Sequence, residues 1–398
     1  MGMDHRERLL TALTRGIPDR VPFSPFMLRW TRYHYGCTCP YHQLKVMQEF
    51  DLDLMVYFGH YTWQTVTNDY IYTPAGGYSY AAAGLYGDLP DVDVDIRIEN
   101  RAEEVWFYRT FRTPAGQLND VLQWARPNLG YGDGPNPHRV EPLIKSEKDL
   151  DALRFLYPEP RRDLLADLPI LLEEIGNRAL VAAYDNTHAG IWGLEPLGEQ
   201  GKLIACIENP QLLKAVARFA QDVHKRNLSA LLERGLKVVF DSWSLASLSV
   251  GWSPQAYREI FLPLLKETVE FVHGFGALYV YQDDGRIREI AADIVAAGID
   301  VLSGLQPPPI GDLPLAEAKE LYGKKVGLMG GLDPCYNFDL GKPELVQQAV
   351  RQAIIDAADG GGYAIGTAEG IAPETPAESL RAGVETVRSC GVYGGDLR

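Results

Sequence analysis

The sequence has no long uninterrupted apolar run. None of its windows supplies the roughly 18 consecutive apolar residues that a membrane-spanning helix needs. Its first segment, MGMDHRERLLTALTRG, is charged and helix-like, without the apolar core and small-residue cleavage site of a signal peptide. We therefore expect a cytoplasmic protein that has no membrane partner.

Basic residues are also few. The chain has 38 Lys and Arg against 53 Asp and Glu, which gives a net charge of −15. It contains no Lys/Arg-rich block with interleaved aromatic residues. A surface of this sign repels polyanions, so we expect no nucleic-acid partner.

Cysteine is scarce as well. The five cysteines are widely scattered and odd in number, which argues against a disulfide framework. Cys37 and Cys39 lie close together in GCTCP, but a metal site needs two further ligands, and none follows at the spacing of a zinc finger. We expect this pair to be reduced loop thiols.

The sequence also lacks a fixed-period repeat, a low-complexity tract and a G-x-G-x-x-G motif after an early strand. The missing glycine motif argues against a dinucleotide-binding sheet. With 46% hydrophobic and 23% charged residues, the composition is that of a globular protein with a sizeable core. The length allows two or three domains, or one α/β barrel.

What the sequence does contain is a clear alternation of strand-like and helix-like segments. The segments 210–235 and 253–276 have helical periodicity, and Ser253 and Pro254 form a helix start. Short β-rich runs, apolar on both faces, are typical of buried parallel strands. They span residues 20–27, 52–59, 179–186, 237–243, 277–284, 300–306, 325–333 and 361–369. Eight such strands with intervening helices predict a (β/α)8 TIM barrel, preceded by an N-terminal helical extension.

One segment departs from this alternation. Residues 61–141 are rich in Tyr, Gly and Pro, and VWFYRTFRTPAGQLNDVLQW predicts an antiparallel hairpin that turns at Thr113 to Gly116. We expect a single barrel domain over residues 1–398, with 61–141 inserted in it as a lid or subunit contact.

Polar residues end six of the predicted strands. Because the active site of a parallel barrel is built at the carboxyl ends of its strands, we expect these side chains to converge. Carboxylates in one cleft raise each other's pKa and become usable acids or bases, or they share a cation. Each residue alone could instead be a helix cap. The residues are Asp185, Asn186, His188, Asp241, Ser242, Gln282, Asp283, Asp284, Gln306, Asp333 and Glu369.

We assign candidate roles within this set. The catalytic candidates are Asp241, Asp284, His188 and Glu369; His188 could instead be a loop histidine bonded to the backbone, and His60 is a weaker candidate. The substrate-binding candidates are Arg29 and Arg32, an anion clamp just past the first strand, with Gln306, Asp333 and Asp185. The alternative for the two arginines is a surface salt bridge or a subunit contact.

Several blocks resemble one known family. RERLLTALTRGIPDRVPFSP, SPQAYREIFLPLLKETVEFVHGFGA, KVGLMGGLDP and GGYAIGTAEGIAPETPAESLRAGVETV are similar to blocks of the uroporphyrinogen decarboxylase superfamily, which includes cobalamin-linked methyltransferases. The resemblance covers most of the chain and is weaker in the insertion. It implies a TIM barrel and a homodimer.

The chain differs from both branches of this family at their functional motifs. The R-Q-A-G-R-Y element of the decarboxylases is replaced by LRWTRY, which keeps Arg29 and Arg32, and their late G-H-G is AEG here. The methyltransferases bind zinc through H-x-C and a later cysteine, whose positions fall on Gln282, Asp284 and Glu369. The resemblance thus implies a site for a divalent metal with oxygen ligands at these three positions. Such ligands suit Mg, Mn or Ca, or zinc in a carboxylate-rich site. The alternative is that no metal binds and Asp284 or Glu369 donates a proton.

Three functions follow as hypotheses. The first is a methyltransferase or demethylase that acts on a small organic substrate with a corrinoid protein or a folate-type carrier. The second is a decarboxylase of a carboxylated pyrrole or porphyrinogen-like acid, with Arg29 and Arg32 holding the carboxylate and Asp241 or Asp284 protonating the product. The third is a ligand-binding barrel without catalysis.

Overall fold

The structure is a computed structural model that describes residues 2–59, 89, 91–125, 137–185, 187–339 and 341–395. His60, Asn186 and much of the predicted insertion lie outside these residues. The chain divides into two compact units. Unit 1 comprises Met1–Gln64, Ala166–Tyr184 and Leu231–Arg398, and unit 2 comprises Thr65–Leu165 and Asp185–Ala230. Among the described residues, no helix combines the length and the apolar character needed to cross a membrane.

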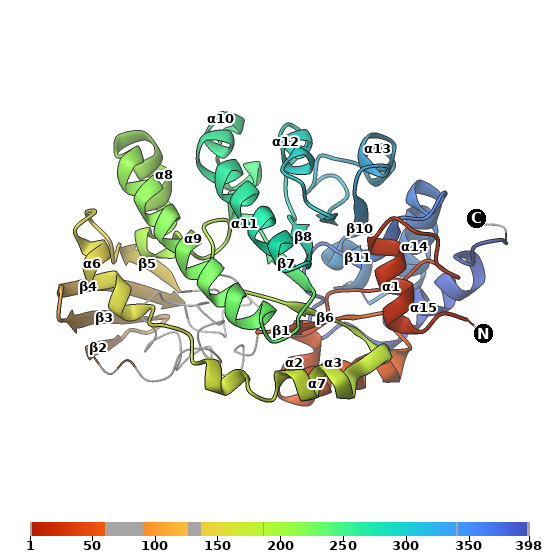
Figure 1. The fold of residues 1–398 in the computed structure, drawn as a ribbon, viewed down its shortest axis with the longest axis horizontal. Coiled ribbons are helices and arrows are strands. Elements are labelled where there is room, and N and C mark those ends of the chain that lie inside the picture. Colours follow the sequence, from red (N-terminus) through yellow and green to blue (C-terminus); the bar gives the residue numbers. More distant parts are fainter. Residues whose placement is uncertain are drawn as a thin grey trace. The chain divides into compact units, whose positions relative to one another are not determined.

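Unit 1 is built on a parallel sheet of seven strands (Figure 1). Their order in the sheet is their order in the chain, so each strand pairs with the next one. Seven of the eight predicted strands are thereby confirmed. They are β1 (Met55–Phe58), β6 (Leu180–Ala183), β7 (Val238–Ser242), β8 (Leu278–Gln282), β9 (Val301–Leu305), β10 (Gly327–Leu332) and β11 (Tyr363–Thr367).

The first predicted strand forms only a bridge. The Ser24 amide donates to the Ile365 carbonyl in β11 (2.8 Å), and the Ile365 amide donates to the Pro22 carbonyl (2.9 Å). On its other side, the Phe23 carbonyl accepts from the amide of Asp53, just before β1 (3.0 Å). Pro22 has no N–H of its own, which limits a longer ladder. The segment thus bonds to residues of both edges of the sheet, while a closed eight-stranded barrel stays a prediction.

The core of unit 1 follows the two-residue period of its strands. Val238 and Phe240 of β7 and Val280 of β8 point into one apolar cluster, to which the N-terminal helix α1 (His5–Leu13) adds Leu9 and Leu13. Alternate residues therefore face the opposite side, toward the helices. The predicted N-terminal helix is confirmed.

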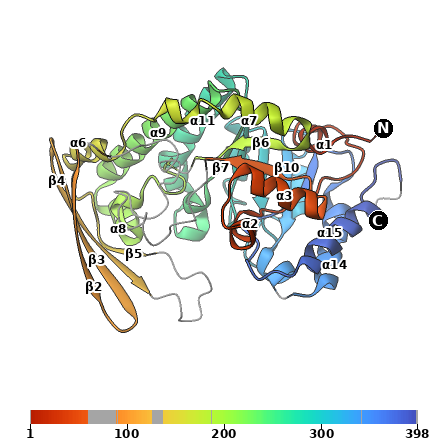
Figure 2. The same cartoon turned by 90° about the horizontal axis from the view of Figure 1, so that it is seen from below.

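The remaining helices of unit 1 connect and flank the strands. The helix α3 packs on α2 and α15, and α15 also packs on α14 (Figure 2). The predicted cap is confirmed, because Ser253 Oγ accepts from the Ala256 amide (3.1 Å). The bounds are α2 (Leu28–Tyr35), α3 (Pro40–Phe50), α7 (Leu168–Ile175), α10 (Pro254–Ala256), the π-helix η8 (Tyr257–Phe261), α11 (Leu262–Gly274), α12 (Ala291–Ala296), α13 (Leu315–Tyr322), the π-helix η9 (Pro334–Asp339), α14 (Pro343–Ala357) and α15 (Ala377–Cys390).

Unit 2 contains an antiparallel sheet of four strands in the order β2-β3-β4-β5. The predicted hairpin is confirmed, since Thr113 pairs with Gly116 at its turn. Buried Asp120 accepts from Arg109 Nε on the paired strand (2.7 Å) and also pairs with Arg139. The elements are β2 (Asp93–Asn100), β3 (Glu104–Thr113), β4 (Gly116–Ala125), β5 (His138–Glu141), α6 (Asp149–Leu153), α8 (Glu199–Glu208) and α9 (Pro210–Leu232), whose last residues belong to unit 1.

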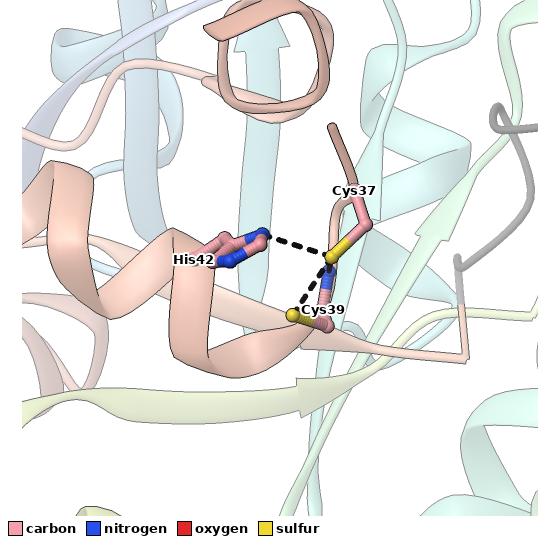
Figure 3. Close-up of side chains that lie close together, drawn as sticks. All are labelled: Cys37, Cys39 and His42. Atoms are coloured by element: carbon pink, nitrogen blue, oxygen red, sulfur yellow. Dashed lines mark hydrogen bonds between the residues drawn. The ribbon is translucent and has the colours of Figure 1, made fainter. Parts of the chain in front are cut away.

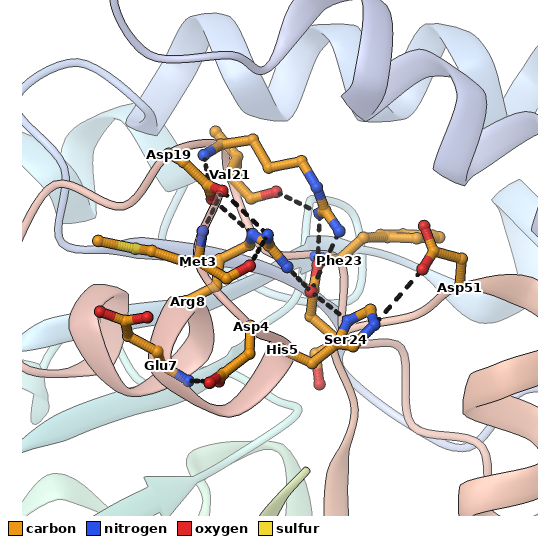
Figure 4. Close-up of polar contacts among 12 residues, drawn as sticks. Met3, Asp4, His5, Glu7, Arg8, Asp19, Val21, Phe23, Ser24 and Asp51 are labelled. Atoms are coloured by element: carbon orange, nitrogen blue, oxygen red, sulfur yellow. Dashed lines mark hydrogen bonds and ion pairs between the residues drawn. The ribbon is translucent and has the colours of Figure 1, made fainter. Parts of the chain in front are cut away.

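Polar contacts of Arg8 and His5 connect α1 with the segment around Val21 and Phe23 (Figure 4). Asp53 is fully buried, and its oxygens accept from Arg8 Nη1 (2.8 Å), Arg20 Nη2 (3.1 Å) and the Phe23 amide (3.1 Å). His5 Nδ1 lies 2.9 Å from Oδ1. Burial alone would raise the pKa of Asp53, but these partners bring it below its ordinary value.

This arrangement predicts a large loss of stability for Asp53→Asn. The neutral amide removes the buried carboxylate from Arg20 and from Arg8, although Asp19 still pairs with Arg8, so the free energy of unfolding should fall by about 3–5 kcal/mol in urea titrations. Asp51→Asn is the matched control. Asp51 has a φ of 55°, which asparagine tolerates, and its ion pairs with Arg388 and His5 are exposed, so the control should change stability by no more than about 1 kcal/mol. Equal effects of the two variants would contradict this role of Asp53.

Candidate active site

A series of hydrogen-bonded polar side chains lies at the carboxyl ends of β7, β8 and β11 in unit 1. Ser242 Oγ lies 2.9 Å from Ser244 Oγ, and Ser244 Oγ donates to Gln282 Oε1 (3.3 Å). Gln282 Nε2 then donates to the Ala368 carbonyl (2.7 Å). Two-residue alternation puts Ser242 on the same side of β7 as Phe240, and Gln282 on the same side of β8 as Val280. This chain of contacts therefore continues the interior face of the sheet beyond its apolar core.

Two carboxyl groups meet beside it. Asp284 and Glu369 are hydrogen-bond partners that affect each other's pKa, and Ser244 opposes the rise in the Asp284 pKa. Burial raises the pKa of Asp284 above its ordinary value. Burial and the negative charge of Asp284 raise the pKa of Glu369 to about 7, and solvent screening moderates the effect because the Glu369 side chain keeps exposed surface. Both shifts favour a protonated carboxyl in this pair.

An arginine lies next to this pair. The positive charge of Arg29 opposes the rise in the Glu369 pKa, and Gly370 leaves room for the Arg29 side chain, since a Cβ there would lie 3.0 Å from Arg29 Cδ. The helix α2 is held in place by Trp30 Nε1, which donates to the Thr375 carbonyl (3.1 Å). Arg32 follows three residues along α2 and is half-buried.

Aromatic rings gather on the same face of the sheet. The ring of Phe26 lies 5.0 Å from Tyr57, 6.2 Å from Tyr184 and 6.1 Å from Phe240, measured between centroids. Tyr57, Tyr184 and Phe240 belong to the interior cluster, and Phe26, which packs against it, keeps exposed surface. We call these four residues the aromatic group; Tyr57, Tyr184 and Phe240 are almost fully buried, so Phe26 is the member whose surface can contact a ligand.

Two aspartates on these strands face the other way. Asp241 alternates with Val238 and Phe240 and accepts from the Tyr279 hydroxyl (2.9 Å). Asp283 accepts from the Tyr281 hydroxyl (3.1 Å) and the Gly285 amide (3.2 Å), and burial raises its pKa well above the ordinary value. The structure therefore does not bring Asp241 to Asp284 and Glu369, and its catalytic role stays a prediction.

Gln306 and Asp333 contact each other. Gln306 Nε2 donates to Asp333 Oδ2 (2.6 Å), while Asp333 Oδ1 accepts from the Tyr336 amide (2.9 Å). Asp333 therefore caps the π-helix η9. Gln306 Oε1 is buried without a hydrogen-bond partner among the described residues, which leaves an acceptor for a ligand.

Asp185 and His188 belong to unit 2. Asp185 is buried and accepts from the Thr187 hydroxyl (2.8 Å), and its Oδ2 lies 3.1 Å from His224 Nδ1. His188 Nδ1 accepts from the Gly190 amide (3.2 Å), which places the proton of a neutral His188 on Nε2. Their predicted roles in substrate binding and catalysis remain predictions.

The metal-binding site predicted at Gln282, Asp284 and Glu369 can be compared with these contacts. Both ends of the Gln282 amide already have partners, and Asp284 and Glu369 are bonded to each other. A cation would have to replace the Ser244 contact and the shared proton. The donor set therefore fits a proton better than a divalent metal, and a metal at Gln282, Asp284 and Glu369 stays a prediction.

Sequence reasoning did not identify Ser244 or the aromatic group. Ser244 lies beyond the end of β7, in the turn that follows the strand, so the alternation of the strand does not extend to it. The aromatic residues belong to runs that are apolar on both faces. In such runs the pattern does not show which face is the interior.

An α/β unit with an acid pair at the carboxyl ends of parallel strands has the arrangement of α/β-barrel enzymes. Residues 200–390 match the family model described as uroporphyrinogen decarboxylase (URO-D). The uroporphyrinogen decarboxylase of Gloeobacter violaceus is 26% identical over 321 residues, which cover 75% of this chain and 84% of the relative. That of Aromatoleum aromaticum is 30% identical over 189 residues, which cover 45% and 48%.

Among solved structures, a methyltransferase from Methanosarcina mazei matches with a TM-score of 0.63 and 15% identity, over 97% of this chain and 99% of the other. At this identity the likeness shows a shared fold. The family match and these relatives support the resemblance to the uroporphyrinogen decarboxylase superfamily that the sequence blocks indicated.

The acid pair predicts a pH dependence of stability. A carboxyl pKa that is raised in the folded state means that folding favours the protonated form. The free energy of unfolding should therefore decrease as the pH rises from about 4.5 to about 7. Glu369→Gln removes one titrating group and should make this decrease smaller in urea titrations at several pH values. The control is Glu270→Gln, at an exposed position of α11, and it should keep the wild-type dependence of unfolding free energy on pH. The same dependence in Glu369→Gln would contradict a proton held by the acid pair.

Proposed function

We propose that this chain is an enzyme that removes a methyl group from a small organic substrate and transfers it to a corrinoid or folate-type carrier. The proposal rests on the acid pair of Asp284 and Glu369. When a methyl group leaves its heteroatom, the heteroatom keeps the bonding electron pair and needs a proton. An acid that still holds a proton near neutral pH can supply it, which lowers the barrier to departure.

The surroundings of the pair suit this chemistry. Gln282 and Ser244 hold the end of β8, from which Asp284 follows, in position through the hydrogen bonds described above. The aromatic group lies on the same interior face, where the exposed part of Phe26 can contact the apolar body of a substrate. The carrier, bound to a partner protein or free, would supply the electron pair that forms the new bond to the methyl carbon.

The porphyrinogen reaction of the curated relatives fits this chain less well. A porphyrinogen carries several carboxylates, and the carboxyl groups of Asp284 and Glu369 would repel them. The net charge of −15 adds to this repulsion. The arginine-rich element expected for porphyrinogen carboxylates is also replaced by LRWTRY.

Decarboxylation of a smaller acid remains the second candidate, because Arg29 lies beside Glu369. There, Arg29 would hold the substrate carboxylate, and Asp284 or Glu369 would protonate the carbon that loses carbon dioxide. Under this function, Arg29→Gln should raise KM for an acidic substrate. It should change KM little for an uncharged methylated one.

Turnover assays test the first proposal. The protein is incubated with methoxy, methylthio and methylamino compounds and reduced free cobalamin, and transfer is followed by the absorbance of methylcobalamin and by mass spectrometry of the demethylated product. Asp284→Asn and Glu369→Gln should lower turnover by about 10²–10⁴-fold, the usual contribution of a general acid. Glu270→Gln is the control and should keep wild-type turnover.

Other outcomes would contradict the proposal. Release of carbon dioxide from an acid without methyl transfer would identify a decarboxylase. Ligand binding without turnover, unchanged in the Asp284→Asn variant, would identify a binding protein.

A further inference from the structure

A second group of reactive side chains lies in unit 1, outside the acid pair. Cys37, Cys39 and His42 converge between α2 and α3 (Figure 3). Cys37 Sγ lies 2.9 Å from Cys39 Sγ and 2.9 Å from His42 Nδ1. All three residues are half-buried, so a small ion can reach them. The spacing is Cys-x-Cys-x-x-His, which differs from that of a zinc finger, and the third ligand comes from the first turn of a helix.

The backbone brings these side chains together. Gly36 ends α2 with a φ of 81°, a left-handed conformation that glycine adopts readily, and turns the chain toward Cys37. Cys39 precedes Pro40, the first residue of α3, and its carbonyl accepts from the His42 amide (3.0 Å). The first turn of α3 therefore carries Cys39 and His42 at a spacing of three residues, on one side of the helix.

A buried glutamine fixes the loop between the two cysteines. Gln43 Nε2 donates to the Thr38 carbonyl (2.7 Å) and to the Tyr57 carbonyl (2.9 Å), while Gln43 Oε1 accepts from the Tyr57 amide (2.8 Å). Thr38 and Gln43 are almost fully buried. These hydrogen bonds of Gln43 hold the loop with Cys37 and Cys39 against the carboxyl end of β1. The loop therefore has this conformation before any ion binds. Such preorganisation is what a binding site requires.

We propose that Cys37, Cys39 and His42 bind one zinc ion. Two thiolates and an imidazole are ligands that zinc prefers, with bonds of about 2.3 Å to sulfur and about 2.0 Å to nitrogen. In tetrahedral geometry these bonds separate the ligand atoms by about 3.6–3.8 Å. The present separations of 2.9 Å need to widen by less than about 1 Å, which small side-chain rotations allow. Three protein ligands leave the fourth position to water or to a substrate atom.

This site is separate from Gln282, Asp284 and Glu369 and does not depend on the proposed function. A soft site of sulfur and nitrogen and a proton-holding pair of carboxyls have different chemistry. If the chain binds zinc, this cluster offers a better donor set than the carboxyl pair does.

Elemental mass spectrometry tests the proposal on the full-length protein purified without an affinity tag. We expect about one zinc per wild-type chain, and at least a tenfold decrease in Cys37→Ser and in His42→Gln. Cys206→Ser, which removes a cysteine of unit 2, should keep the wild-type zinc content. The variant with both Asp284→Asn and Glu369→Gln should also keep it.

Cobalt substitution gives a second readout that does not depend on activity. Wild-type protein loaded with Co²⁺ should show a thiolate-to-metal charge-transfer band and the intense visible bands of a tetrahedral site. The band should weaken in Cys37→Ser and change in position in His42→Gln, whose folding is checked by circular dichroism.

Several results would overturn the zinc site. The first is a zinc content that stays at the wild-type level in Cys37→Ser and His42→Gln. The second is a loss of zinc in the Asp284→Asn, Glu369→Gln variant alone, and the third is stoichiometric copper or iron in place of zinc. An intact mass that shows an oxidised Cys37–Cys39 pair, in protein purified without reductant and free of metal, would also overturn it.

Discussion

The buried charge of Asp53 is the interaction on which the arrangement of unit 1 depends. Its carboxylate gathers Arg8 from α1, Arg20 from the bridging segment and the backbone amide of Phe23. A buried ion is stable only when its partners remain in place, so this cluster fixes the bridging segment between β11 and the start of β1. Phe26 and Arg29 follow within a few residues, so the position of Phe26 in the aromatic group and that of Arg29 beside Glu369 depend on this cluster.

Strand alternation then decides which polar residues can act together. Gln282 and Asp284 lie with the polar residues of the interior face, next to Ser244. Asp283, which stands between them, accepts from the Tyr281 hydroxyl on the other face. Neighbouring acids thus have different roles although the same strand end carries them. Asp284 lies beside Glu369, while Asp283, whose pKa is raised by burial, accepts from the Gly285 amide and holds the turn there.

The two candidate sites of unit 1 also follow from the chemistry of their donors. Carboxyl groups in contact, with few compensating charges, are best stabilised by a shared proton. Thiols and an imidazole that converge without a carboxylate suit a soft divalent ion. A metal and an acid can therefore operate in one unit without competing for ligands.

Much of the fold is determined by local sequence pattern. Buried strands, helix starts such as Ser253 and the hairpin turn at Thr113 to Gly116 depend on residues close together in the chain, and the structure confirms them. The sequence also placed Arg29, Asp284 and Glu369 at strand ends. Only the tertiary structure decided that these three meet, that Asp241 faces the other side of β7, and that His42 joins two cysteines. Strands that are apolar on both faces do not reveal which face is the interior, and contacts between distant residues depend on packing that no local pattern encodes.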